Sequence, residues 1–458
     1  MQYFFFRKNH EDYFETLREK TKMYGHVYGT YQGLKPVLRI SSREHIKEAL
    51  SQKFYLAFEK TMAVKTGSEL WDNDIYNADY KTWRKYRPLS SHVLTGLKLR
   101  AMKSKLERVA NRLAAKLQRL AQNNAQMPTK TYAQGAVMDA VAAVSFSLEV
   151  DALEDPHNPF VKHSTGLFDG CLGLTVLTAF PHMLENLPFV QFPSVSTERF
   201  FMDFALDLLR KRRKESRKRD DPDALDAWLE VQTTNPDLTD AMMISQMFVF
   251  LTAGYETSAY VLMYVLYLLA THPKTQENIF RDIEDNISDG DSITFEQYHK
   301  MKLLEAAIYE TLRLYPTDHA IDRVTVSSCT IAGVPLDPHV GIQVPLSSVH
   351  MDPERFPEPT KFRPERFLDG GGNVDDMVAF GDGPRKCVGQ RLAIFQMLVL
   401  LVAFLRVVRL EPADDDEFFD PSLEYQSEIE RVPGQIFMPF PKRELKIKLA
   451  PRKSVRTE

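Results

Sequence analysis

Apolar and polar positions alternate with a helical period along much of this chain. Residues 98–121 and 196–219 repeat apolar side chains every three to four positions and predict two amphipathic helices. A longer apolar run over 239–270 predicts a third helix, with Thr239 as its N-cap and His272-Pro273 marking its end. Helix outweighs sheet, so the pattern indicates a mainly α fold with a small β-sheet region. The predicted strands lie at 36–40, 329–331 and 341–345.

The apolar helix over 239–270 has two interpretations. At 1.5 Å per residue it is roughly 45 Å long, enough to cross a folded domain or a bilayer. Hydropathy alone favours a transmembrane helix, as in a channel or a receptor. Polar residues such as Gln246, Glu256 and Thr257 stand in its middle, however. A carboxylate at the centre of a span is costly and normally signals function.

Composition is that of a globular protein with a substantial core. The chain has 458 residues, 44% of them hydrophobic and 26% charged, which excludes disordered and fibrous classes. A net charge of −4 gives no reason to expect a nucleic-acid partner. The basic run 210–219 precedes several aspartates and predicts a solvated helix end. The apolar start, Met1 to Phe6, is too short for a signal peptide or a membrane span.

The three cysteines are far apart, so a disulfide framework is not expected. One of them, Cys387, lies in a loop punctuated by glycines and followed at once by an apolar helix that starts near Val388. The positive end of that helix and the nearby Arg385 favour a thiolate at Cys387. An inert buried cysteine in a turn is the competing interpretation.

The segment from Phe380 to Gly389 resembles the haem-binding loop of the cytochrome P-450 family, Phe-Gly-x-Gly-x-Arg-x-Cys-x-Gly, at every fixed position. The resemblance implies a single catalytic domain over 1–458, a triangular prism with haem b between the long helix and the cysteine loop. It makes Cys387 the axial ligand of the iron. The residues it places around the cofactor are Phe380, Gly381, Arg385 and Gly389.

The middle of the long helix, Ala253 to Ser258, resembles the oxygen-activating stretch of the same family. The Thr257 hydroxyl can donate to the carbonyl of Ala253 and bend the helix locally. Gly254 removes a side chain and leaves room beside the oxygen. The resemblance implies that Glu256 and Thr257 are an acid–alcohol pair that relays protons to the activated oxygen.

Two further sets of residues gain their meaning from the resemblance. Glu310 and Arg313 share a helix face and, in this family, form a buried charge triad with an arginine that here is Arg366. A second Pro-Glu-Arg-Phe at 353–356 is a decoy. Cations are expected to converge on the haem propionates, and the candidates are Trp83, Arg87, Arg323 and Arg385.

The expected activity is that of a monooxygenase which inserts one atom of O2 into an apolar steroid, fatty acid or xenobiotic. The resemblance supplies the partners: NADPH electrons arrive through a P-450 reductase, with cytochrome b5 as a further candidate. It also implies the cytoplasmic face of the endoplasmic reticulum membrane, with contact through a phenylalanine-rich segment from Phe160 to Phe192. An anchor helix is not visible in this sequence, and a soluble protein is the alternative. Expected docking residues for the reductase are Arg84, Lys85, Lys98 and Lys386.

Substrate contacts are less determined by the sequence, because core packing explains the same residues equally well. The candidates are Phe248, Phe250, Thr317, Asp318 and His319. A haem-thiolate isomerase of the thromboxane-synthase type and a non-catalytic haem sensor are the other functions considered. The acid–alcohol pair argues against both. The segments Tyr24 to Gly29 and Leu269 to Pro273 resemble most the eukaryotic microsomal branch that contains the vertebrate liver drug-oxidising enzymes, the insect xenobiotic oxidisers and thromboxane synthase.

Overall fold

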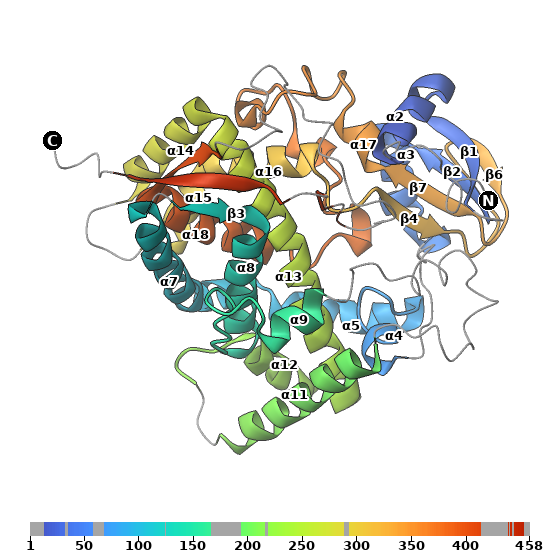
Figure 1. The fold of residues 1–458 in the computed structure, drawn as a ribbon. Helices are drawn as coiled ribbons and strands as arrows, with labels where there is room; N and C mark the ends of the chain where they lie inside the picture. Colours follow the sequence, from blue (N-terminus) through green and yellow to red (C-terminus); the bar gives the residue numbers. More distant parts are fainter. Residues whose placement is uncertain are drawn as a thin grey trace.

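Helices make up most of the structure, a computed structural model that describes residues 13–32, 35–57, 68–123, 125–165, 194–215, 219–287, 293–413, 438, 440–441 and 444–452 (Figure 1). The helices are α2 (Tyr13–Tyr24), α3 (Arg43–Lys47), α4 (Glu69–Asp72), α5 (Tyr80–Val93), α6 (Gly96–Ala101), α7 (Lys103–Gln122), α8 (Thr129–Phe146), α9 (Pro159–Thr165), α11 (Val195–Lys214), α12 (Ala224–Thr234), α13 (Asp240–Thr271), α14 (Pro273–Asn286), α15 (Phe295–Lys300), α16 (Lys302–Leu314), α17 (Leu346–His350) and α18 (Gln390–Val407). Short turns of 3-10 or π type are η1 (Glu48–Gln52), η2 (Phe54–Leu56), η3 (Pro364–Phe367), η4 (Val374–Asp376) and η5 (Gly383–Arg385).

The strands form three small sheets, and the largest lies at one side of the molecule beside α2 and α3 (Figure 1). The strands are β1 (Val27–Gln32), β2 (Lys35–Ile40), β3 (Gln126–Pro128), β4 (Ala320–Val324), β5 (Cys329–Ile331), β6 (Val334–Leu336), β7 (Gly341–Pro345), β8 (Val408–Pro412) and β9 (Lys446–Pro451). The largest sheet has the order β1-β2-β7-β4, in which β2 and β7 run parallel with Leu38 opposite Ile342. The other sheets are β3-β9-β8 and β5-β6. The predicted strands and the mainly α class are confirmed.

The long helix α13 runs through the helical part of the molecule (Figure 1). It begins as predicted, because the Thr239 hydroxyl accepts a hydrogen bond from the amide of Met242 at 3.3 Å. Nearly all of its residues are buried, since α4, α8, α11, α16 and α18 surround it. Both α13 and α18 are long and apolar enough to cross a membrane, but 78% and 67% of their most apolar windows are buried inside the fold. Core packing therefore accounts for their composition.

The prediction of one helix over 98–121 is wrong in one respect. The chain breaks at Met102, so α6 ends at Ala101 and α7 begins at Lys103. The Met102 amide contacts two carbonyls of the preceding turn, those of Lys98 and Leu99. The Met102 side chain is buried like the other apolar residues of this face. The hydrophobic pattern therefore continues across the break and does not reveal it.

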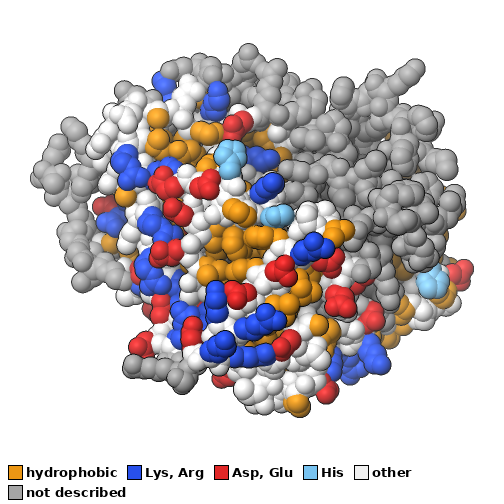
Figure 2. All heavy atoms as spheres, turned by 60° about the horizontal axis from the view of Figure 1, so that its bottom comes forward, with side chains coloured by type: hydrophobic (Ala, Val, Ile, Leu, Met, Phe, Trp, Pro, Cys, Tyr) orange, Lys and Arg blue, Asp and Glu red, His pale blue; other side chains and the backbone are white. Residues whose placement is uncertain are grey.

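The basic run at the end of α11 is matched by neighbouring carboxylates. Arg212 is buried, with its guanidinium 2.8 Å from Asp223 and 2.6 Å from Asp226. Arg213 pairs with Asp240 of α13 at 2.5 Å. The expected solvated helix end is therefore wrong for Arg212, which ties α11 to α12. Figure 2, turned toward the end of the molecule that carries α11 and α12, shows charges of both signs interspersed around a hydrophobic area.

Candidate active site

Cys387 lies in a tight loop between η5 and α18. The Cys387 amide donates to the carbonyl of Phe380 at 2.8 Å, which closes the loop. Gly381 and Gly383 have φ values of 76° and 67°, a region that other residues rarely adopt. A Cβ on Gly383 would lie 2.0 Å from the carbonyl oxygen of Leu50. The glycines thus let the loop pack on η1, and the Cys387 side chain remains exposed.

The surroundings of Cys387 favour a thiolate. Helix α18 begins at Gln390, two residues later than predicted, so its free N–H groups lie directly after the cysteine. The Arg87 guanidinium of α5 donates to the carbonyl of Lys386 at 2.5 Å. Burial lowers the pKa of Arg87, and its Coulombic interaction with Cys387 opposes that shift. A cation and a helix N-terminus therefore stand beside the sulfur.

The middle of α13 contains an accessible position within an otherwise buried helix. Ala253 is exposed and Thr257 is half-buried, one turn apart. The Thr257 hydroxyl donates to the Ala253 carbonyl at 2.6 Å, as the sequence suggested. Glu256 is 2% exposed and projects from a different side of the helix, because consecutive helical residues are about 100° apart. The two members of the expected acid–alcohol pair thus have different environments.

Gly254 lies beside helix α8. A Cβ at this position would make ordinary contacts with the side chain of Val141 on α8, at 3.6 and 3.7 Å. The residue therefore faces a neighbouring helix. That Gly254 makes room beside bound oxygen stays a prediction, while Ala253 is the most exposed residue of this stretch.

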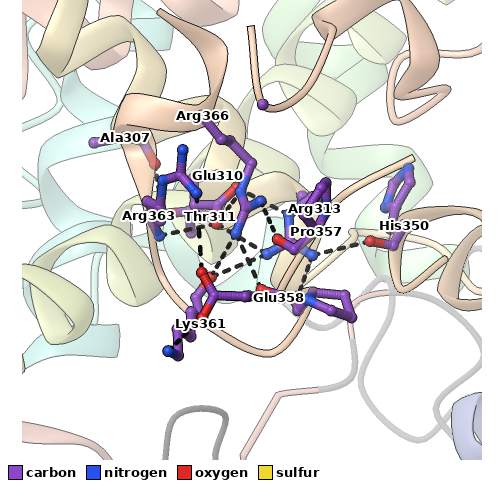
Figure 3. A network of polar contacts seen from close by, with 12 residues as sticks. Ala307, Glu310, Thr311, Arg313, His350, Pro357, Glu358, Lys361, Arg363 and Arg366 are labelled. Carbon is purple, nitrogen blue, oxygen red and sulfur yellow. Dashed lines mark hydrogen bonds and ion pairs between the residues drawn. The ribbon is translucent and has the colours of Figure 1, made fainter. Parts of the chain in front are cut away.

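The predicted charge triad is assembled deep in the core (Figure 3). Glu310, Arg313 and Arg366 are each 0% exposed. The Glu310 carboxylate accepts from Arg313 Nε and Nη2 at 2.9 Å each and from Arg366 Nε at 2.9 Å. The remaining guanidinium N–H groups bind carbonyls of the 350–361 segment, so the buried charges are fully engaged. Arg355 of the decoy motif lies elsewhere, bonded to Ser41 and Asp352.

Helix α5 and the cysteine loop bring the expected propionate-binding groups together. The Arg385 guanidinium lies 4.9 Å from the centroid of the Trp83 ring. Arg323 on β4 is 3% exposed, and its Nη1 donates to the Asp322 carbonyl at 2.7 Å. Its buried Nε has no hydrogen-bond partner among the residues that the structure describes. Desolvation lowers the pKa of Arg323 to about 10. A buried donor that the described residues leave unsatisfied suits an acceptor on a bound group.

The predicted substrate residues divide into two groups. Phe248 is 3% exposed with its ring 5.2 Å from that of Phe201, which favours the core-packing interpretation. Phe250 is half-buried against Trp228. Thr317 and Asp318 are half-buried. His319 is buried, with Nδ1 3.1 Å from Asp318 Oδ1. The structure therefore leaves Thr317 and Asp318 as accessible polar candidates.

Tyr76 was missed by the sequence reasoning. The residue is 41% exposed, and desolvation together with the charges of Asp318 and Asp322 raises the pKa of its hydroxyl. The sequence signal that could have pointed to Tyr76 is Asp74, a residue type that favours turns, two positions before it.

These features fit haem, and together with the mainly helical fold they define a haem-thiolate enzyme. They comprise an accessible cysteine, an accessible position on the central helix and a buried arginine N–H for which the described part of the chain provides no acceptor. The cytochrome P-450 family model matches residues 1–432, and the chain belongs to this family.

Curated relatives cover most of the chain. It is 28% identical over 414 residues to cytochrome P-450 3A14 of Cavia porcellus, covering 87% of this chain and 82% of the relative. It is 30% identical over 410 residues to lithocholate 6-beta-hydroxylase of Mesocricetus auratus, covering 86% and 81%. It is 29% identical over 411 residues to cytochrome P-450 3A1 of Rattus norvegicus, covering 86% and 81%.

The family establishes the class of reaction. The protein is a monooxygenase that binds haem iron, uses NADPH electrons delivered through a reductase and acts on apolar organic substrates. The predictions of family, enzyme class and cofactor are confirmed.

Proposed function

We propose that Cys387 is the axial ligand of the haem iron and that residues 1–458 form one catalytic domain around this cofactor. The observation that carries the proposal is the exposed Cys387 sulfur, which a glycine loop holds at the N-terminus of α18 with Arg87 beside it. Bound haem supplies the oxidising chemistry, in which one atom of O2 enters the substrate and the other leaves as water.

Four side chains would hold the haem propionates: Trp83, Arg87, Arg323 and Arg385. Support comes from the buried Nε of Arg323, for which no described residue is an acceptor, and from the stacking of Arg385 on Trp83. Guanidinium groups suit carboxylates because they donate in a fixed fork. Phe380, Gly381 and Gly389 would contact the face of the ring nearest the sulfur, where small residues allow close approach.

Thr257 and Glu256 would deliver protons to the distal side. The Thr257 hydroxyl donates its hydrogen bond to the Ala253 carbonyl. Its oxygen is then left to accept a hydrogen bond from water or from substrate. Because Glu256 is buried on a different side of α13, its proton reaches Thr257 through water or after a side-chain rotation. The Ala253 side chain is only a methyl group, so it would let a substrate approach this surface of α13.

The substrate would be a steroid, fatty acid or xenobiotic, and one relative is named as a hydroxylase of lithocholate. Arg84 and Lys386 are the better docking candidates for the reductase or cytochrome b5, because Lys85 and Lys98 already pair with Asp237 and Glu230 at 3.1 and 2.9 Å. We place the enzyme at the endoplasmic reticulum membrane. The phenylalanine-rich segment expected to touch it begins at Phe160, whose ring packs 5.3 Å from Phe200 and 4.9 Å from Phe204. Its other phenylalanines, within 168–192, lie outside the described residues.

The ligand assignment is tested by Cys387→Ser, with Cys329→Ser as the matched control. The dithionite-reduced wild type and the control are expected to show the red-shifted CO band of a thiolate ligand, and Cys387→Ser is expected to lose it. Retention of that band in Cys387→Ser would exclude Cys387 as the ligand.

A further inference from the structure

Helix α5 holds the cysteine loop at two consecutive residues. Trp83 and Arg87 are four positions apart, so they lie on one face of this helix. The Arg385 guanidinium lies 4.9 Å from the centroid of the Trp83 ring. The Arg87 guanidinium donates through Nη2 to the Lys386 carbonyl at 2.5 Å, across a separation of 299 residues in the chain. The two residues that precede Cys387 are therefore both in contact with α5.

The peptide bond between Lys386 and Cys387 is fixed at both ends. Its carbonyl accepts from Arg87, and its N–H, which belongs to Cys387, donates to the Phe380 carbonyl at 2.8 Å. The Lys386 amide donates in turn to the Gly383 carbonyl at 3.0 Å. Because a peptide group is planar, these bonds fix the plane from which the Cys387 side chain projects.

The bond from Arg87 differs from the other two, because its donor carries a positive charge. Arg87 is half-buried, so water screens this charge only in part. A cation bound to the carbonyl next to Cys387 stabilises negative charge on the sulfur. It thereby reduces the electron density that the sulfur can give to a bound iron. A guanidinium has several N–H donors, so this bond is compatible with the proposed propionate role of Arg87.

We propose that Arg87 is a positioning residue for the monooxygenase reaction, which acts through the Lys386–Cys387 peptide on the sulfur and so sets the potential at which the iron accepts an electron. The inference rests on the proposed function, because it takes Cys387 as the axial ligand. A weaker sulfur donor favours the reduced iron, as do other interactions that surround a metal ligand and tune the metal. Loss of the Arg87 charge therefore lowers the reduction potential.

The test is a spectroelectrochemical titration of the iron in the purified holoenzyme, together with the infrared C–O stretch of its reduced CO complex. Arg87→Gln keeps a neutral N–H donor but removes the charge. It is expected to lower the ratio of reduced to oxidised iron at a fixed potential about tenfold, or about 59 mV for one electron. It should also lower the C–O stretching frequency, because a stronger sulfur donor passes more electron density through the iron to CO.

Two variants separate the charge from other effects of the substitution. Arg87→Lys keeps the cation and is expected to remain close to wild type in both measurements. Lys81→Gln is the matched control, since it removes one exposed positive charge from the same helix and should change neither value. Arg87→His is a second test in case Arg87→Gln does not retain haem. Its side chain is cationic at about pH 5.5 and neutral at about pH 8, so its potential should fall more than that of wild type between these values.

An unchanged potential in Arg87→Gln, or equal falls with pH in Arg87→His and wild type, would overturn the inference. A lower potential with an unchanged C–O frequency would also overturn it, because the charge would then act through a propionate and not through the sulfur. The proposed ligand fails separately, if the wild type lacks the thiolate band. A normal band with a potential that does not respond to Arg87 would refute only the inference drawn here.

Discussion

Replacing Glu310 by glutamine is expected to destabilise the protein far more than any surface charge change. The carboxylate accepts four hydrogen bonds, two from Arg313, one from Arg366 and one from the Arg363 amide, at 2.9 to 3.0 Å. Both guanidinium partners are 0% exposed. Glutamine keeps the shape but removes the charge, so two buried cations lose their counter-ion. Removing one member of such a network costs about 3–5 kcal/mol, a large part of a typical stability of about 5–15 kcal/mol.

The measurement is urea unfolding followed by far-UV circular dichroism, with the haem-to-protein ratio of each preparation as a second readout. Glu305→Gln is the matched control, because Glu305 lies on the same helix and pairs with the largely exposed Lys302 at 3.0 Å. That surface pair is worth about 0–1 kcal/mol. A loss below about 1 kcal/mol for Glu310→Gln, or equal losses for the two variants, would refute the reasoning from buried charge.

Three more predictions follow from local geometry. Gly383→Ala should abolish haem retention, because its Cβ would lie 2.0 Å from the Leu50 carbonyl, whereas Gly29→Ala, with open space around it, should retain haem; equal haem content would contradict the loop argument. Thr257→Val should keep haem but raise the hydrogen peroxide released per NADPH several-fold. Thr252→Val removes an equivalent hydrogen bond to the Phe248 carbonyl and should not raise it. An unchanged peroxide yield in Thr257→Val would exclude Thr257 from the proton path. Burial, reinforced by the Arg313 charge, lowers the pKa of His350 from 6.5 to about 3, so its contribution to stability is complete above pH 6.5 and declines toward pH 3 by about 1.4 kcal/mol per pH unit. Urea midpoints measured across that range should fall less steeply for His350→Phe than for wild type, and the exposed His339→Gln should behave like wild type; parallel curves for all three would exclude His350.

Much of the fold could be predicted from local pattern. The Thr239 cap, the end of α13 before Pro273 and the strands β5 and β7 follow from nearest-neighbour chemistry, and the structure has them where expected. The break at Met102 could not be predicted, because a buried methionine satisfies the helical pattern on both sides of it. The buried ion pairs of Arg212 also escaped prediction, since a basic run alone does not reveal the carboxylates that fold against it.

For the site, the residues that carry chemistry were visible as motifs, but their orientation was not. Gly254 and Ala253 are neighbours in one motif, yet one faces α8 and the other is accessible. Helical periodicity defines faces, whereas the packing of α8 decides which face is covered. Tyr76 carries no motif, and its position depends on a turn held by Gln246 from a helix about 170 residues away.

The linear chain alone determined the family, the cysteine loop, the central helix and the mainly α class, because these depend on residue identity and on spacing within a few turns. Tertiary structure decided which groups are buried, which charges are matched and which side chains remain accessible. Those properties arise from contacts between segments far apart in the chain, and the cost of burying a polar group depends on the partner that it meets there.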